Sequence, residues 1–186
     1  SHEQVLKWLN DMERRLSDIQ SKADLSEKKA ELQRIKGMYE DIVMYDNMVK
    51  SVTGKASNLT DRSPTSRSTI NTSEILTKYN NVKEQATTLL AGSQQSVTLH
   101  QDFHDNCHSF LSWLQMAAEK FTTCCDTFGD KSTIEAKVER AKLLLASLSQ
   151  GTQLLSQATK AGEATLPSTS AAGQMKIRQE LQKISA

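Results

Sequence analysis

Proline, glycine and aromatic residues are all scarce in this chain of 186 residues. It contains 2 Pro and 7 Gly, and aromatic side chains make up 5% of it. The low glycine content excludes a collagen-like chain, and the shortage of aromatic residues speaks against a β-sheet protein. Leu, Gln, Glu and Lys are abundant instead, and these straight-chain residues lose little rotamer freedom in a helix. The composition therefore predicts an all-α fold.

The net charge is also close to zero, because the chain has 23 Lys and Arg residues and 22 Asp and Glu residues, for a formal net charge of +1. Neither half of the chain has a basic field, so we expect no nucleic acid, no lateral actin binding and no direct membrane contact by this segment. An exchangeable lipid-binding helical bundle stays open as the alternative function. That function would need broad apolar stripes with basic flanks.

The chain has only three cysteines, Cys107, Cys124 and Cys125. Their odd number and irregular spacing exclude a disulfide framework and indicate a reducing compartment such as the cytoplasm. Because no His neighbours Cys124 or Cys125, we expect core packing at Cys124 rather than redox chemistry.

Metal, catalytic and cofactor motifs are missing as well. His100, His104 and His108 share helical spacing, but no Glu-x-x-His pattern accompanies them, so we expect structural or solvated histidines rather than metal ligands. No glycine-rich phosphate loop occurs, and a slender helical bundle offers no pocket for a catalytic triad. We expect no enzyme, no cofactor and no metal.

What the chain does contain is an internal repeat. Trp8-Leu9 recurs as Trp113-Leu114, 105 residues later. Apolar residues around the two pairs match with alternating steps of three and four: Val5, Leu9, Met12, Leu16, Ile19 and Ala23 on Phe110, Leu114, Ala117, Phe121, Cys124 and Phe128. This alternation places one apolar seam along a helix.

Two further helices repeat in the same way, with an offset of 106 in the second. Its seam matches Leu32, Ile35, Tyr39, Ile42, Met48 and Val49 with Val138, Ala141, Leu145, Leu148, Leu154 and Leu155. Capping-box spacing at Asp24 and at Ser132 predicts where the second helices begin. Pro64 and Pro167 predict the loops before the third helices.

The repeat predicts two tandem three-helix bundles. The first covers residues 1–98, with helices at about 2–22, 25–59 and 68–98, and the second covers 99–186, with helices at about 99–128, 132–162 and 173–186. The last helix is shorter than its counterpart, so we expect an unfinished second unit of a longer rod. No proline interrupts residues 75–128, which predicts one helix shared by both bundles. Its seam turns polar at the junction, around Gly92, Ser93, Ser96 and His100.

A triple-helical unit of about 105 residues, the Trp-Leu pair at Trp8 and Trp113 as core markers, and a shared helix resemble the spectrin repeat. The second unit is most similar to repeats of the giant nesprins, through Phe103, Cys107, Phe110, Trp113-Leu114, Lys120-Phe121, Gly129-Asp130-Lys131, Gly151, Leu154-Leu155 and Gly173.

The resemblance implies a non-enzymatic scaffold. It implies a rod at the cytoplasmic face of the outer nuclear membrane, which couples the nucleus to the actin cytoskeleton. The implied partners are neighbouring repeats, an actin-regulating protein such as a formin, and actin only indirectly.

Two surfaces are candidates for protein docking. Met38, Val43, Met44, Tyr45 and Met48 add apolar side chains to the second helix beyond its seam, and Met44 and Met48 lie on the face turned away from the seam. Flexible thioethers suit an adaptable binding surface. A locally shifted seam, with Met48 matching Leu154, is the alternative. The second candidate is the uncharged stretch 143–159, for which a plain solvated surface is the alternative.

Overall fold

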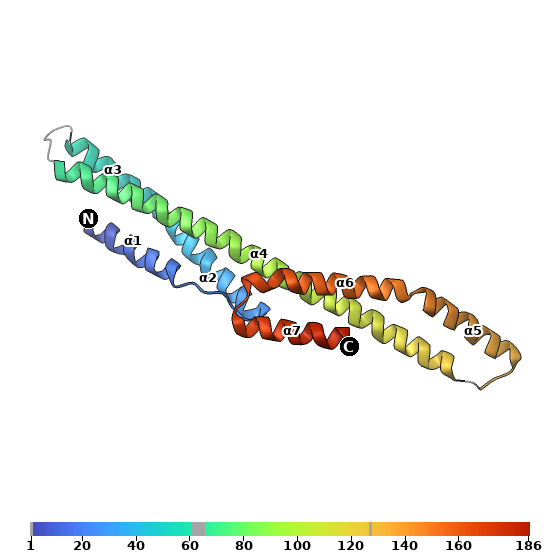
Figure 1. Cartoon of the computed structure of the whole chain (residues 1–186). Helices are drawn as coiled ribbons and strands as arrows, with labels where there is room; N and C mark the ends of the chain where they lie inside the picture. The colour runs from blue at the N-terminus through green and yellow to red at the C-terminus, as the bar shows by residue number, and fades with distance from the viewer. Residues whose placement is uncertain (1, 61–65, 127) are drawn as a thin grey trace. The chain divides into compact units, whose positions relative to one another are not determined.

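The chain is mostly helical over the part that the structure describes. The computed structural model describes residues 2–60, 66–126 and 128–186, with the side chains of 56–57, 59–60 and 66–71 left out, and no strand occurs in them. In chain order the helices are α1 (His2–Ser17), α2 (Leu25–Met44), α3 (Asp46–Thr60), α4 (Ser66–Cys125), α5 (Lys131–Ala146), α6 (Leu148–Thr165), the 3₁₀ helix η1 (Leu166–Ser168) and α7 (Ala171–Ser185) (Figure 1). The all-α prediction is confirmed.

The helices form two compact units. Unit 1 consists of Ser1–Lys22 and Ser26–Val97, and unit 2 consists of Ala23–Leu25 and Thr98–Ala186. The short segment Ala23–Leu25 belongs to unit 2 because it lies against the start of α7. A Cβ atom added to Gly173 would come within 2.2 Å of the Ala23 carbonyl oxygen, so this approach requires glycine.

Helix α4 supplies residues to both units and runs unbroken from Ser66 to Cys125. It contains no proline, and Pro64, the residue expected to mark the preceding loop, lies outside the described residues. All four predicted junction residues lie inside α4. Ser96 and His100 are buried, whereas Gly92 is exposed, so polar seam residues are accommodated without interrupting the helix.

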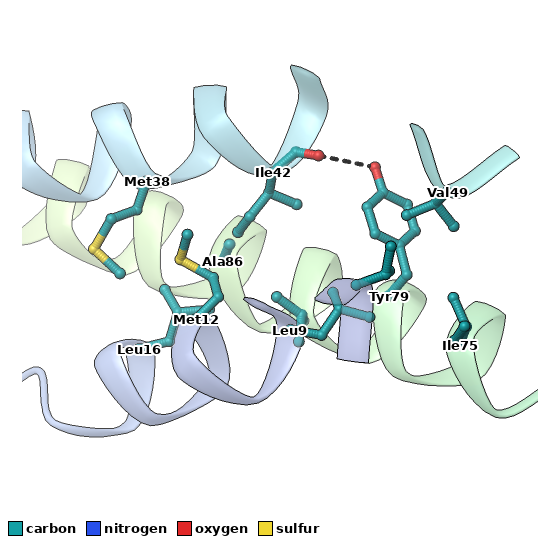
Figure 2. Packing of buried hydrophobic residues seen from close by; sticks show 11 residues of the cluster. Leu9, Met12, Leu16, Met38, Ile42, Val49, Ile75, Tyr79 and Ala86 are labelled. Atoms are coloured by element: carbon teal, nitrogen blue, oxygen red, sulfur yellow. Dashed lines mark hydrogen bonds between the residues drawn. The ribbon is translucent and has the colours of Figure 1, made fainter. Parts of the chain in front are cut away.

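The predicted helix at 25–59 is two helices, α2 and α3, which meet at Tyr45. The Tyr79 hydroxyl donates a hydrogen bond of 3.1 Å to the carbonyl oxygen of Ile42, close to this break (Figure 2). A side chain that bonds into the hydrogen-bond ladder of a helix is a known cause of kinks. The break therefore depends on a tertiary contact rather than on a glycine or proline.

The predicted helix at 132–162 is likewise two helices, α5 and α6, which meet at Ser147. The Ser147 N–H is shared between the carbonyl oxygens of Leu143 and Leu144, at 3.1 and 3.0 Å. The Ser147 hydroxyl also donates to Leu144, at 2.7 Å. A serine that bonds back to the preceding turn bends a helix, which accounts for the position of this break.

The core of unit 1 follows the predicted seam closely. Its buried side chains come from α1, α2, α3 and the first half of α4: Val5, Leu9, Met12, Leu16, Met38, Ile42, Val49, Ile75, Tyr79, Val82 and Ala86 (Figure 2). Spacing of three and four brings one apolar stripe of each helix into this core. Met38, predicted as part of the exposed patch, is buried here, so that prediction is wrong for this residue.

The core of unit 2 is smaller and lies between α4, α6 and α7. Phe103, Phe110, Ala158 and Ile177 are its buried apolar residues. Gly162 permits the close approach, because a Cβ atom there would lie 2.9 Å from the Phe103 ring and 3.0 Å from Leu181.

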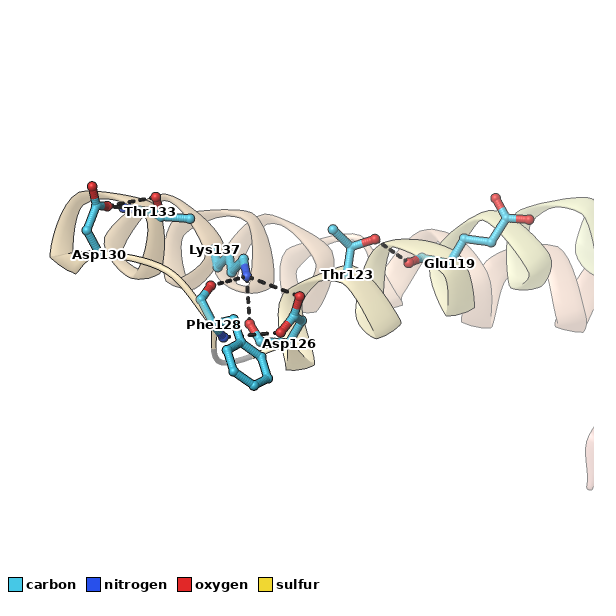
Figure 3. Close-up of polar contacts among 7 residues, drawn as sticks. All are labelled: Glu119, Thr123, Asp126, Phe128, Asp130, Thr133 and Lys137. Carbon is cyan, nitrogen blue, oxygen red and sulfur yellow. Dashed lines mark hydrogen bonds and ion pairs between the residues drawn. The ribbon is translucent and has the colours of Figure 1, made fainter.

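Two helix starts differ in detail from the sequence expectations. Helix α5 begins at Lys131, where the Asp130 carboxylate accepts from the Thr133 N–H at 2.8 Å (Figure 3). Asp130 is therefore the cap, and the expected capping residue Ser132 lies inside the helix. Pro167 lies in η1, and Ser170 caps α7 by accepting from the Gly173 N–H. The Gln174 amide bonds both Leu166 and Thr169 carbonyl oxygens, which stabilises this connection.

Candidate protein-docking surface

The methionines at the α2–α3 break are exposed. The exposed fraction is 77% for Met44 and 49% for Met48, and the neighbouring Val43 is exposed as well. These three side chains define the methionine patch of unit 1. Its thioethers can adapt to the shape of a partner because each Met side chain has three rotatable bonds.

Tyr45, the third residue predicted to bind a partner, lies differently. Its ring stacks on Trp8 with ring centroids 3.8 Å apart and an interplanar angle of 5°. Trp8, predicted as a core marker, is half-buried and packs against the core of unit 1. The structure therefore separates the three predicted residues: Met44 and Met48 are exposed, and Tyr45 supports the fold beneath them.

Polar contacts stabilise the backbone below the methionine patch. Asp46, the first residue of α3, forms an ion pair with Lys50 at 2.5 Å, and this contact lowers the pKa of the Asp46 carboxyl. Burial, assisted by the negative charge of Asp46, raises the pKa of Tyr79 to about 12. The Tyr79 hydroxyl therefore stays protonated, and able to donate to Ile42, to a higher pH than an ordinary tyrosine.

The uncharged stretch 143–159 contains exposed leucines, at Leu143, Leu145 and Leu148. Leu143 also borders a groove of about 490 Å³ between α4 and α5, together with Glu119, Lys120, Thr123, Cys124, Arg140, Leu144 and Ser147. Lysine, arginine and glutamate all border it, so the groove has no field of a single sign. The surface of this stretch therefore includes exposed leucines as well as the Ser, Thr and Gln side chains.

Trp113, the second core marker, is half-buried and packs on the backbone of α6. A Cβ atom added to Gly151 would lie only 2.2 Å from the Trp113 ring. The ring also stacks near Phe110, with centroids 6.4 Å apart. Glycine at 151 therefore provides the space that the indole occupies.

The described titratable side chains of α4 form no metal site. Among the residues that the structure describes, no group of three His, Cys, Asp or Glu side chains is placed to hold a metal ion. His100 is buried and tilts against Phe103, with ring centroids 6.2 Å apart. Burial and the nearby charge of Glu180 raise the pKa of the Cys107 thiol to about 11, so that the thiol stays protonated at neutral pH.

Over the described residues, none of the helices combines the length and the apolar character that crossing a membrane requires.

No protein-family model matches the chain. The chain is similar to a segment of a Drosophila melanogaster protein, "Muscle-specific protein 300 kDa", with 31% identity over 176 residues. The alignment covers 88% of this chain and 1% of that protein, so the chain spans a very small part of its relative's length. Together with the all-helical fold, this similarity supports a structural or scaffolding role.

Proposed function

We propose that the chain is a non-enzymatic segment of a long cytoskeletal rod, where it acts both as a spacer and as a docking site for another protein. Two observations support the spacer role. Helix α4 supplies residues to both units without a break, and the similar segment belongs to a protein about a hundred times longer than the alignment. Helical units joined through one helix transmit force along the chain and favour cooperative unfolding.

The cellular setting follows from the resemblance to nesprins. In this proposal the rod lies in the cytoplasm, at the outer nuclear membrane, and couples the nucleus to actin through an actin-regulating protein such as a formin. Direct actin binding by this segment is not part of the proposal, because basic and acidic residues balance along the chain.

The methionine patch is the observation that carries the docking role. Exposed Met44 and Met48 stand beside a helix break whose backbone is fixed by Tyr79 and by the Tyr45–Trp8 stack. Interfaces are enriched in methionine at their apolar centres, and a rigid base lowers the entropic cost of binding. A rigid backbone under adaptable side chains suits recognition of an apolar partner surface.

The test compares capture of a formin from cytosol by the immobilised chain and by its Met44→Asp, Met48→Asp double variant. We expect immunoblotting to show that the double variant loses the formin, while circular dichroism shows unchanged helix content. The matched control is the Met116→Asp, Met175→Asp double variant, since both methionines are exposed in unit 2. Equal capture by the two double variants would contradict the docking role, and unfolding of the first would show that the methionine patch belongs to the core.

Vesicle flotation separates this proposal from the alternative of a lipid-binding bundle. Anionic vesicles rich in phosphatidylserine should leave the chain at the bottom of the gradient, because basic and acidic residues balance along the sequence. Flotation with such vesicles would favour the lipid-binding alternative.

A further inference from the structure

Tyr45 is the tyrosine that the fold places at a break between helices. It lies between the end of α2 at Met44 and the start of α3 at Asp46. The other two tyrosines of the chain, Tyr39 and Tyr79, lie inside α2 and α4. A tyrosine kinase binds its substrate segment in an extended form, so a tyrosine at a break reaches the kinase with less unfolding than one inside a helix.

The three tyrosines also differ in how their side chains are held. Tyr79 is 3% exposed, and its hydroxyl donates to the carbonyl oxygen of Ile42 (Figure 2). Tyr39 packs against the core of unit 1. Tyr45 is half-buried and stacks on Trp8, which is half-buried too. Tyr45 can therefore leave its position by rotating away from Trp8, whereas release of Tyr79 would open the core.

The first turn of α3, directly after this tyrosine, has a sequence that favours transient opening. Asn47, Val49 and Gly54 all form helices less readily than alanine does. Asn47 is exposed, and the ion pair between Asp46 and Lys50 that spans the turn has a largely exposed lysine. Exposed ion pairs of this kind add little stability.

The residues before Tyr45 suit recognition by a kinase. Two exposed carboxylates, Glu40 and Asp41, precede it by five and four residues, and Met44 directly before it is apolar and exposed. Cytosolic tyrosine kinases commonly select acidic residues on this side of the tyrosine, with an apolar residue next to it. The break therefore presents a tyrosine within a suitable substrate segment.

The residues after Tyr45 indicate which domain would bind the modified form. SH2 domains bind phosphotyrosine through arginine and read the following residues for specificity. One class of SH2 domain selects asparagine two residues after the phosphotyrosine, in a segment that forms a β-turn. Asn47 occupies this position.

The backbone after Tyr45 already resembles that turn. Asp46 and Asn47, which would be its central residues, lie in the first turn of α3. The dihedral angles of a type I turn are close to those of an α-helix. The folded chain thus holds the segment near the conformation that this class of SH2 domain binds, which lowers the entropic cost of binding.

We infer that Tyr45 is a tyrosine phosphorylation site, and that its phosphorylated form recruits an SH2 domain of the class that selects asparagine two residues after the phosphotyrosine. In the modification, the Tyr45 hydroxyl oxygen forms a bond to the γ-phosphorus of ATP, and the bond from that phosphorus to the β,γ-bridging oxygen breaks. ADP leaves, and the hydroxyl proton passes to the catalytic aspartate of the kinase. The inference goes beyond the docking of a formin and does not depend on it.

The phosphate also favours release of the ring from Trp8. It adds a charge of about −1.5 to −2 beside the C-terminal end of α2, where the helix dipole is negative. The last turn of α2 contains an acidic residue, Asp41, and no basic one. The modified Tyr45 ring is therefore expected to stay out of the stack, where an SH2 domain can bind it.

The first measurement treats the full chain with a purified non-receptor tyrosine kinase domain and Mg-ATP, and mass spectrometry follows each tyrosine. Tyr45 should be modified about tenfold faster or more than Tyr39 and Tyr79, because those two require a helix to open first. Tyr45→Phe keeps the ring that stacks on Trp8 and should lose most of the incorporated phosphate. Modification of Tyr39 or Tyr79 as fast as Tyr45, or none at Tyr45, would overturn the inference.

The second measurement is isothermal titration of the phosphorylated chain with a purified SH2 domain of the asparagine-selecting class. Binding should saturate at a ratio of one to one. Asn47→Ala should weaken it about tenfold or more, because the hydrogen bonds of the asparagine amide are lost. The matched control is Met48→Ala, since Met48 is exposed at the next position and should leave binding unchanged.

Absence of SH2 binding, or equal binding by Asn47→Ala and the original phosphorylated chain, would contradict the inference. A loss confined to Met48→Ala would contradict it as well, because the segment would then be read in extended form by another class of SH2 domain. Unphosphorylated Tyr45→Phe should still capture the formin from cytosol. Failure of this inference is therefore distinguishable from failure of the proposed function.

Discussion

The two tryptophans of the repeat are supported in opposite ways. Trp8 stacks on the ring of Tyr45, whereas Trp113 lies on the bare backbone of Gly151. Tyr45 and Gly151 are counterparts in the repeat, at the same offset of 106 that relates the second helices. A large side chain provides the surface in unit 1, and the absence of a side chain provides it in unit 2. Both units therefore place a tryptophan at the same repeat position, but the residue that contacts its ring differs between them.

The two units also differ in how far their seams are buried. The same spacing buries Leu9 and Leu16 in unit 1, whereas their counterparts in unit 2, Leu114 and Phe121, are exposed. Apolar burial contributes roughly 25 cal/mol per Å² of area removed from water. Equivalent positions in the two units should therefore contribute unequally to stability.

Truncation of the paired leucines gives the largest expected contrast. Leu9→Ala should lower the free energy of unfolding by about 2 to 5 kcal/mol, because it opens a cavity in a closed core. Leu114→Ala should lower it by about 1 kcal/mol or less, since that side chain is already half exposed. Urea unfolding followed by circular dichroism measures both.

Equal costs for the two leucine variants would show that Leu114 is as well covered in solution as Leu9 is.

Lys28 and its counterpart in the repeat have the opposite burial from what their polarity suggests. Lys28 is buried, whereas its counterpart Ile134 is exposed, and burial lowers the pKa of the lysine to about 8 from 10.5. Between these two pKa values the unfolded chain binds more protons than the folded chain, so stability should rise with pH across this window. The rise is on the order of 3 kcal/mol at most.

The measurement is the difference in unfolding free energy between pH 8 and pH 10.5 for the original chain and for Lys28→Met. The variant should lack the contribution of Lys28 while keeping those of Tyr79 and Cys107. Identical pH profiles would show that Lys28 reaches solvent. Lys29→Met is the matched control, because that lysine is exposed.

Gly151→Ala tests how Trp113 is supported. The added methyl group would overlap the indole, and such overpacking typically costs about 1 to 3 kcal/mol. Trp113→Leu should relieve the clash, so the double variant should be more stable than the two separate effects predict. A thermal unfolding series of the four proteins gives the coupling energy. Additive effects would place the indole away from Gly151.

Seam spacing predicted most of the core of unit 1, because Val5, Leu9, Met12 and Leu16 need only helical periodicity to share a face. Met48 is the exception, since the repeat places it in the seam but it is 49% exposed. The absence of proline from 75–128 likewise agrees with the helix that runs to Cys125, because no residue in that stretch lacks its N–H, whereas Asp126 and Phe128 lie beyond the end of the helix. These features depend on local sequence alone.

Features set by contacts between distant residues were not predictable in this way. The break at Tyr45 is accompanied by the Tyr79 hydroxyl, 37 residues after Ile42, and the ring of Tyr45 is held by Trp8. Phe121 has the same seam spacing as buried Leu16 but is 60% exposed, a difference that spacing alone does not predict. Within the candidate site, Met44 and Met48 lie on the surface as their spacing suggested, whereas Tyr45 and Met38 are engaged in packing.

Gly92 lies inside α4 at a position where no other described part of the chain packs against it. A Cβ atom there would meet no atom within 4 Å, in contrast to Gly151. Gly92→Ala should therefore stabilise the chain by about 1 kcal/mol, the difference in helix propensity between the two residues. Urea unfolding measures the gain, with Gly54→Ala in α3 as a matched control at an equally open position. A loss of stability at Gly92 alone would mean that α4 requires a flexible residue there, so that the shared helix bends in solution.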